Sequence, residues 1–313
     1  MHVDAVVVTR NRAPLLTACL SSILGQTHPV RSVVVSDDGS SDDTPAVVDD
    51  FRRRFADAAI RLDYHRHDPP LGQEANRRYA MLHSAGPLVA FLDDDDFWQP
   101  DFVRRSVEVM ANEPDVGLVA TGVNFVGDDG SLLVEVAATE DARSGRKGLA
   151  EGIHRDWLPL HVAGPAFLLD SVLFRRHVLE QVGFIPQGSG GICDFALFVV
   201  LAINGWPMFW VPDPLVNYRV HQHGRATDGV VEMPTVLADW CHSFSQTVKD
   251  ATARRLISEK GIAAHRAVVL LHAADRNAKA TSRELMRFIR RHGLRDLNWR
   301  EIATALFMLG GLK

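Results

Sequence analysis

The chain has 313 residues, of which 46% are hydrophobic and 23% are charged, enough for one large domain with or without an appended part. A formal net charge of −5 argues against nucleic-acid binding through overall positive charge. Three widely spaced cysteines, Cys19, Cys193 and Cys241, form no metal-binding or disulfide pattern, which favours a reducing cytoplasm. We find no secretion signal and no apolar run near the roughly 20 residues that cross a bilayer. We therefore expect a cytoplasmic protein, with any membrane contact peripheral and at the inner face.

Strand-like and helix-like segments alternate through the first third of the chain. Runs of β-branched or alternating apolar residues predict strands at Val3–Thr9, Val33–Ser36, Ile60–His65 and Leu88–Leu92. Apolar residues at helical spacing predict helices at Ala13–Leu24, Thr44–Phe55 and Ala75–Ser84. This alternation predicts an α/β fold with a mainly parallel sheet flanked by helices, which binds ligands at the carboxyl ends of its strands.

The remaining sequence predicts less regular structure and then a helical end. We expect further strands within Val116–Val136 around a turn at Gly127–Gly130, followed by a polar loop over Thr139–Gly148. A helix that ends at Gly183, an apolar helix that begins near Asp194, and strand and turn structure over Phe209–Arg219 follow. From about Glu232 the composition becomes helical, so we place a boundary near residue 228 and predict a helical extension over residues 229–313.

Polar residues stand at the points where three of the predicted strands end. They are Thr9–Arg12, Asp37-Asp38 and the acidic run Asp93–Asp96. Because the carboxyl ends of parallel strands meet at one edge of a sheet, we expect these side chains to form one site.

Four consecutive aspartates, Asp93–Asp96, follow a buried strand and repel one another, which raises their pKa values. A divalent ion such as Mg²⁺ or Mn²⁺, which also binds phosphate oxygens, would remove this repulsion. The alternative is a solvated loop in which Asp96 caps the helix that begins after Pro100. The apolar residues on both sides of the run favour the metal-binding interpretation.

Three segments taken together resemble the GT-A fold glycosyltransferases of family 2. They are Val6–Arg12, Val33–Thr44 and Phe91–Trp98, and Ser22–Thr27 also fits. The similarity extends over roughly the first 225 residues. It implies a GT-A, Rossmann-like catalytic domain over residues 1–228, with a nucleotide-binding part at about 1–115 and an acceptor-binding part at about 116–228.

The resemblance implies that Thr9 and Arg12 line the nucleotide pocket. It places Asp38 at the edge of the uracil, where a carboxylate accepts a hydrogen bond from the ring N–H, and it makes Asp37 its neighbour. For both aspartates the alternative is a β-turn with an Asx motif, which is common after strands.

Four further residues correspond to donor-binding positions of the family. Asn76 and Arg77 touch the nucleotide or simply begin a helix. Asp93 faces the ribose or the metal ion, and Asp94 competes with it for that role.

The residues expected to bind the metal ion and the diphosphate come from both halves of the region that resembles the family. Asp95 corresponds to the metal ligand of the family's DxD motif. His221 lies in a segment that resembles the family's Tyr-Arg-x-His and would bind the metal ion or a phosphate oxygen, with His223 as a nearby rival. Arg219 would offset the charge of the diphosphate.

Inverting members of the family use a carboxylate at the start of a helix to take the acceptor's proton. The family's Glu-Asp pair appears here as Cys193-Asp194, so Asp194 is the candidate base. The alternative for Asp194 is an ordinary helix N-cap. Cys193 cannot supply the charge of the glutamate, which affects the expected acceptor side.

The predicted function is inverting transfer of a sugar from a UDP-sugar to an acceptor hydroxyl or amine, with Mn²⁺ or Mg²⁺ as cofactor. The acceptor is a saccharide, a lipid carrier, a protein or a small natural product. The alternatives are a nucleotidyltransferase, against which the absence of glycine from Thr9–Pro14 counts, and a non-catalytic nucleotide-sugar-binding protein.

The helical extension carries basic and apolar residues at helical spacing in Arg283–Arg291. This helix either packs on its own domain with a solvated basic face or lies on a membrane surface. Trp299 and Phe307–Leu309 would serve a contact between copies in a homo-oligomer or cover the acceptor site.

Overall fold

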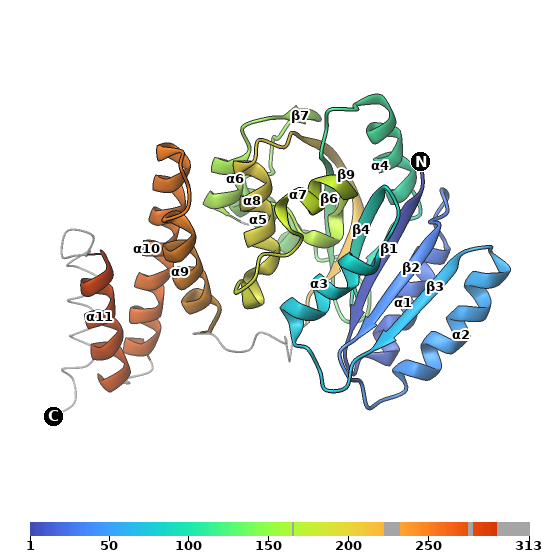
Figure 1. Cartoon of the computed structure of the whole chain (residues 1–313), viewed down its shortest axis with the longest axis horizontal. Coiled ribbons are helices and arrows are strands. Elements are labelled where there is room, and N and C mark those ends of the chain that lie inside the picture. The colour runs from blue at the N-terminus through green and yellow to red at the C-terminus, as the bar shows by residue number, and fades with distance from the viewer. Residues whose placement is uncertain (165, 222–231, 275–277, 293–313) are drawn as a thin grey trace. The chain divides into compact units, whose positions relative to one another are not determined.

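The computed structural model describes residues 1–164, 166–221, 232–274 and 278–292 (Figure 1). The chain forms two compact units. The first comprises Met1–Gln187 and Cys193–His223, and the second comprises Gly188–Ile192 and Gly224–Lys313.

The first unit is built on a nine-stranded sheet with the strand order β3-β2-β1-β4-β8-β6-β9-β5, in which β7 also pairs with β9. The strands are β1 Val3–Thr9, β2 Ser32–Asp37, β3 Arg61–Arg66, β4 Leu88–Asp93, β5 Phe97–Trp98, β6 Leu118–Val126, β7 Gly152–His154, β8 Val172–Arg175 and β9 Met208–Arg219. Neighbouring strands among β1 to β4 are parallel, whereas β8 is antiparallel to both β4 and β6. The predicted α/β class is confirmed. The parallel part of the sheet is formed by the strands that alternate with helices in the sequence.

Helices cover both faces of this sheet (Figure 1). They are α1 Ala13–Leu24, α2 Thr44–Asp57, α3 Gln73–His83, α4 Phe102–Asn112, α5 Val134–Ser144, α6 Leu158–Ala163, α7 Arg176–Val182 and α8 Cys193–Ile203. Val3, Ala5 and Val7 pack on the side of α1, α2 and α4, whereas Val6 and Val8 pack on the side of α3, α7 and α8. Because β1 is buried on both faces, it reads as a continuous apolar run in the sequence.

The polar loop predicted over Thr139–Gly148 is wrong for its first half, because α5 extends to Ser144. Ser144 is the one buried residue of α5, so this helix leaves no periodic apolar stripe in the sequence. It ends before Gly145, whose φ of 74° a glycine adopts without strain. The predicted end of a helix at Gly183 is confirmed by α7, which ends at Val182.

The turn predicted at Gly127–Gly130 is also confirmed. It follows β6, and the Gly127 amide donates to the carbonyl of Ser131 at 2.9 Å. Val126 then bridges Leu132 in antiparallel fashion, so the chain reverses over this short hairpin.

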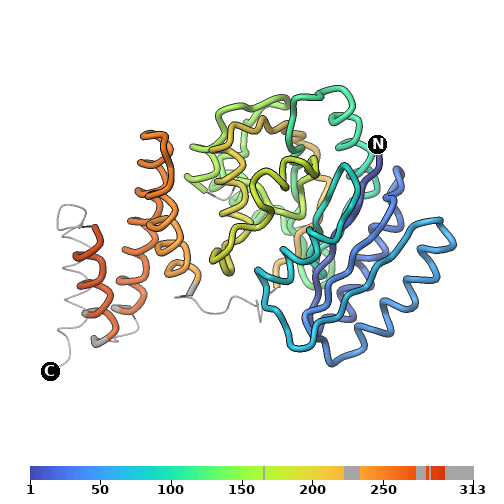
Figure 2. The backbone as a smooth tube through the Cα atoms, viewed as in Figure 1, coloured from blue at the N-terminus to red at the C-terminus, as the bar shows by residue number. Residues whose placement is uncertain are grey.

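The second unit contains three α-helices in its described part: α9 Glu232–Ser245, α10 Ala251–Ala274 and α11 Ala278–His292. Helices α9 and α10 run side by side (Figure 2). On α11, Phe288 is fully buried, and Arg287 and Arg291 both pair with Asp239 of α9. The apolar face of the basic helix thus packs within its own unit. His223, Trp299 and Phe307–Leu309 lie outside the described residues.

No helix in the described part of the chain combines the length and the apolar composition needed to cross a membrane.

A buried imidazole, His265, lies between α10 and α11 with only 2% of its surface exposed. Its Nδ1 lies 3.2 Å from Nε2 of His292, and its Nε2 lies 3.6 Å from the carboxylate of Glu284. Burial lowers the pKa of His265, the positive charge of Arg291 lowers it further, and Glu284 acts in the opposite direction. The neutral form of His265 is therefore favoured in the folded unit.

We expect the stability of the helical unit to fall as the pH drops below about 6.5, the ordinary pKa of an unfolded-chain histidine. The unfolded chain then binds a proton at His265 that the folded unit disfavours, so acid shifts the equilibrium toward unfolding. The His265→Phe variant should show a smaller drop in melting temperature between pH 7.5 and 5.5 than the wild type. His2→Gln, at an exposed position, is the control and should keep the wild-type drop. An unchanged drop in His265→Phe would contradict the prediction.

Candidate active site

Three of the predicted site residues end neighbouring strands. Thr9 ends β1 and lies beside Asp37 at the end of β2, while Asp93 ends β4 and lies beside Val8 of β1. Thr9 and Asp37 are buried. The predicted convergence of these side chains at the carboxyl edge of the sheet is confirmed.

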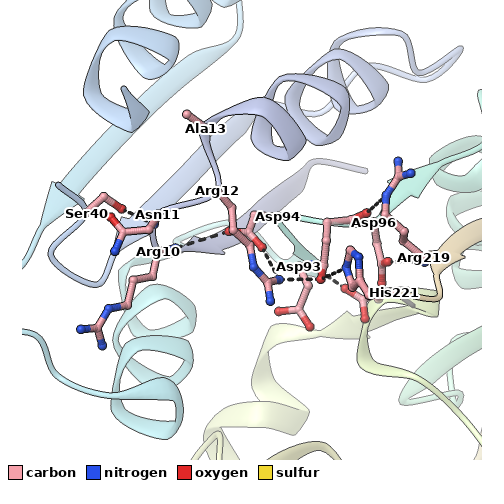
Figure 3. A network of polar contacts seen from close by, with 12 residues as sticks. Arg10, Asn11, Arg12, Ala13, Ser40, Asp93, Asp94, Asp96, Arg219 and His221 are labelled. Atoms are coloured by element: carbon pink, nitrogen blue, oxygen red, sulfur yellow. Dashed lines mark hydrogen bonds and ion pairs between the residues drawn. The ribbon is translucent and has the colours of Figure 1, made fainter. Parts of the chain in front are cut away.

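Arg12, from the loop after β1, binds two carboxylates of the acidic run (Figure 3). Its Nη1 donates to Asp94 Oδ1 at 3.1 Å and to Asp95 Oδ2 at 2.5 Å. The backbone amide of Arg10 donates to the other oxygen of Asp94 at 3.3 Å. Burial and the charge of Asp95 raise the pKa of Asp94 to about 7, although Arg12 acts in the opposite direction. This corner of the site therefore brings two carboxylates to one guanidinium.

The last aspartate of the run, Asp96, is 1% exposed and does not cap the following helix. Asp101, not Asp96, precedes α4, so the alternative of Asp96 as a cap is wrong. Asp96 instead accepts a hydrogen bond from the amide of Arg219 at 2.8 Å. Burial raises the pKa of Asp96, and the neighbouring charge of Asp170 raises it further. Sequence reasoning missed Asp170, whose carboxylate accepts from the amide of Asp93 at 2.5 Å.

His221 and Arg219 enter the site from the end of β9. His221 Nε2 lies 3.0 Å from Asp95 Oδ2, and its Nδ1 lies 2.9 Å from Asp128 Oδ1. The guanidinium of Arg219 donates to the backbone carbonyls of Asp95, Gly127 and Asp128 at 3.1, 3.1 and 2.9 Å. His221 thus lies beside Asp95, the other residue predicted to bind a metal ion, while Arg219 binds backbone carbonyls of Asp95, Gly127 and Asp128.

Asp95 and His221 fit a divalent ion if a diphosphate supplies further ligands. Their side chains are 16% and 15% exposed, so both reach solvent at the rim. Among the described residues, no group of three or more His, Cys, Asp or Glu side chains is arranged to hold a metal ion. Mg²⁺ sites commonly use one or two protein ligands and complete the shell with phosphate oxygens and water. One carboxylate oxygen and one imidazole nitrogen 3.0 Å apart suit such a shared site.

Asp37 and Asp38 are both hydrogen-bonded within the protein. Asp37 accepts from the amide of Ser40 at 2.8 Å and from the hydroxyl of Tyr64 at 2.6 Å, as in the Asx-turn alternative. Burial and the hydrogen bond to Asp37 raise the pKa of Tyr64. Both carboxylate oxygens of Asp38 accept from the amide of Gly72 at 3.1 Å, which ties the end of β2 to the start of α3.

Asn76 and Arg77 of α3 point into the protein. The amide of Asn76 pairs twice with Ser36 of β2, accepting from its hydroxyl at 2.6 Å and donating to its carbonyl at 3.1 Å. Arg77 donates to Asp93 at 2.5 Å and to the sulfur of Cys193 at 3.1 Å. Both side chains therefore bind residues at the carboxyl edge of the sheet, Ser36 near the end of β2 and Asp93 at the end of β4.

We expect Asn76→Ala to lower the free energy of unfolding by about 1–3 kcal/mol, because Ser36 would lose two buried hydrogen bonds and its hydroxyl would keep only the contact with His67 Nε2 at 2.9 Å. Urea denaturation measures the change. Asn204→Ala is the matched control, since Asn204 is an exposed asparagine with a single bond to the carbonyl of Val200. Equal effects of the two substitutions would rule out a supporting role for Asn76.

Asp194 lies in the first turn of α8, where its Oδ1 accepts from the amide of Phe195 at 2.9 Å. It is only partly buried. Its neighbour Cys193 is fully buried, and burial raises the pKa of the thiol although Arg77 acts in the opposite direction. A neutral thiol thus stands where the resemblance of the sequence motifs implies a charged glutamate.

The comparison with protein families decides the affiliation. Residues 4–168 match the family model described as glycosyl transferase family 2. The chain belongs to this family. The resemblance inferred from the sequence motifs is confirmed.

Several curated relatives of this family 2 chain are glycosyltransferases. An uncharacterized glycosyltransferase of Nostoc sp. is 30% identical over 222 residues, which are 71% of the chain and 65% of the relative. The GalNAc(5)-diNAcBac-PP-undecaprenol β-1,3-glucosyltransferase of Campylobacter jejuni is 26% identical over 229 residues, 72% of the chain and 67% of the relative. The chain therefore spans about two thirds of the length of these relatives.

Solved structures share the fold. The structure of Staphylococcus aureus TarS residues 1–349 in complex with UDP-GlcNAc superposes with a TM-score of 0.68 at 14% identity, covering 95% of this chain and 83% of that one. The mannosyltransferase PcManGT of Pyrobaculum calidifontis, in complex with GDP-Man and Mn²⁺, gives a TM-score of 0.62 at 20% identity, covering 99% and 86%. The predicted GT-A fold is thereby confirmed.

Proposed function

We propose that this chain is an inverting glycosyltransferase that moves a sugar from a UDP-sugar to an acceptor hydroxyl or amine and depends on Mn²⁺ or Mg²⁺. Residues 1–228 would form the catalytic part. One observation carries the proposal: Arg12, Asp95 and His221, from three distant segments, meet at the carboxyl edge of the sheet. The guanidinium of Arg12 suits the negative charge of a diphosphate, and the adjacent Asp95 and His221 suit the divalent ion that the diphosphate would carry.

We propose that the nucleotide-binding residues expected from the sequence form the donor site. It comprises Thr9, Arg12, Asp37, Asp38, Asn76, Arg77, Asp93 and Asp94. Asn76 and Arg77 act through Ser36 and Asp93, since their polar groups face these residues. We assign the metal position to Asp95 and His221.

A bound ion would supply electrostatic stabilisation of the departing diphosphate. Arg12 places positive charge at the same corner and holds Asp94 and Asp95 in position before the donor binds. Arg219, the residue expected to offset diphosphate charge, adds positive charge behind the carbonyl of Asp95. Asp194 accepts the acceptor's proton at its carboxylate. The amide of Phe195 donates to Oδ1 of that carboxylate and holds it in place.

The Campylobacter relative's name describes an acceptor on a diphosphoundecaprenol carrier. By analogy, we propose a saccharide on a lipid carrier as the acceptor and peripheral action at the inner face of the membrane. An acceptor assay should compare sugar transfer to lipid-linked saccharides with sugar transfer to soluble saccharides.

The test is calorimetric titration of UDP with and without Mn²⁺, followed by a mass-spectrometric screen of nucleotide sugars with purified protein. We expect UDP to bind more tightly with Mn²⁺ and one UDP-sugar to be consumed. Release of inorganic diphosphate would favour the nucleotidyltransferase alternative. Tight donor binding without turnover on any acceptor would favour a non-catalytic binding protein.

A further inference from the structure

The turn Gly127–Gly130 lies directly beside His221, although the proposed reaction assigns it no role. Of its two aspartates, Asp129 accepts from the amide and the hydroxyl of Ser131 at 2.9 and 2.6 Å and so stays within the turn. Asp128 instead reaches His221, 93 residues away in sequence. The same turn thus contains one carboxylate that shapes it and another that binds the imidazole.

The two nitrogens of His221 face different carboxylates. Nε2 lies 3.0 Å from Asp95 and Nδ1 lies 2.9 Å from Asp128 (Figure 3 shows His221 beside the acidic run). Because these nitrogens are on opposite sides of the ring, one ion bound at Nε2 cannot also be bound by Asp128. Asp128 therefore contacts the imidazole on the side away from the metal position.

A neutral imidazole has one N–H and one nitrogen with a free lone pair. If Asp128 accepts the Nδ1 proton, the lone pair must be on Nε2, which points at Asp95 and the metal position. A carboxylate partner of this kind also fixes the ring orientation and raises the basicity of the ligand nitrogen.

Arg219 keeps Asp128 in place. Its Nη1 binds the carbonyls of Gly127 and Asp128, while its Nε binds the carbonyl of Asp95. The contacts run from Asp95 through His221 to Asp128 and return through Arg219 to Asp95. A closed set of contacts restrains the two metal-facing side chains relative to each other more than the His221–Asp95 pair alone would.

We propose that Asp128 is a positioning residue that fixes the tautomer and orientation of His221, so that Nε2 is presented to the divalent ion of the donor complex. This inference rests on the proposed function. Asp128 is 54% exposed, and exposed ion pairs contribute little to stability, so its removal should affect the metal site without unfolding the protein.

The test measures the affinity for Mn²⁺ in the presence of saturating UDP, by calorimetry and by the electron paramagnetic resonance signal of free Mn²⁺. We expect Asp128→Ala to weaken Mn²⁺ binding by about 10–100-fold, the usual effect of losing such a partner. Asp128→Asn should lose less, because its amide oxygen still accepts the Nδ1 proton. Asp129→Asn removes the same charge from the same turn and keeps the acceptor for Ser131, so it should bind Mn²⁺ as the wild type does.

Nitrogen-15 NMR of the Mg²⁺–UDP complex gives a second readout, in which the wild type should show the proton of His221 on Nδ1. Unchanged Mn²⁺ affinity in Asp128→Ala, or a proton on Nε2 in the wild type, would overturn the inference and leave the proposed function intact. Equal losses of Mn²⁺ affinity in Asp128→Ala and Asp129→Asn would show that only the negative charge of the turn matters, and this result would also overturn the inference. If the wild type with UDP binds no Mn²⁺, the metal dependence of the proposed function fails, and this inference fails with it.

Discussion

The Asp95→Ala variant should lose about 10²–10³-fold in kcat, and Mn²⁺ should no longer increase its affinity for UDP. Asp95 is the one carboxylate of the acidic run that contacts both Arg12 and His221. Its removal deletes the proposed ion ligand and leaves Arg12 with Asp94 as its remaining partner in the acidic run. Steady-state assays with the donor found in the screen and titration of UDP with Mn²⁺ measure the two effects.

The matched control for this variant is Asp49→Ala. Asp49 is an exposed aspartate that pairs with Arg52 at 2.8 Å on α2, so its loss should leave both quantities unchanged. The proposed metal site would have to be abandoned if Asp95→Ala kept the Mn²⁺ dependence of the wild type.

The second large effect is expected for Asp194→Asn, which should lower kcat by about 10²–10⁴-fold, the usual contribution of a general base. An asparagine Oδ1 can still accept from the amide of Phe195, so the start of α8 is preserved. The substitution therefore removes the basic carboxylate and leaves its supporting hydrogen bond. UDP affinity should stay within experimental error of the wild type, because the change lies on the proposed acceptor side.

Single-turnover rates with saturating donor separate this loss from any change in binding. Asp250→Asn is the control, since Asp250 accepts from the amide of Ala253 at the start of α10 and undergoes the same chemical change. A wild-type turnover rate in Asp194→Asn would show that Asp194 serves only as a helix cap.

The sequence predicted elements well where burial leaves a periodic or continuous apolar signal. The predicted bounds of β1 and α1 agree with the structure, because these elements are buried on both faces or along one regular stripe. The short strand β5 could not be predicted, since Phe97 and Trp98 form it only by pairing with β9. Helix α5 was missed for a related reason, because it buries almost none of its side chains.

In the site, the sequence identified which side chains would gather but not how they bind one another. Asp38 stays a proposed ligand of the uracil edge, and the sequence did not predict that it also accepts from the amide of Gly72. Asp170 stands in a segment without a recognisable motif, and Asp128 stands in the predicted turn, which by itself does not indicate a site. They reach the site by contacts across 77 and 93 residues. A local pattern contains no information about such contacts.

The amino-acid order alone determined that acidic and basic side chains follow the strands β1, β2 and β4, because parallel strands bring their carboxyl ends to one edge. Tertiary structure decided which charges pair there. Arg12 lies against Asp94 and Asp95 because β1 pairs with β4, and His221 lies between Asp95 and Asp128 because β6 and β9 are neighbours in the same sheet. Hydrogen bonds act over about 3 Å, so the partner of a side chain depends on how distant segments pack together.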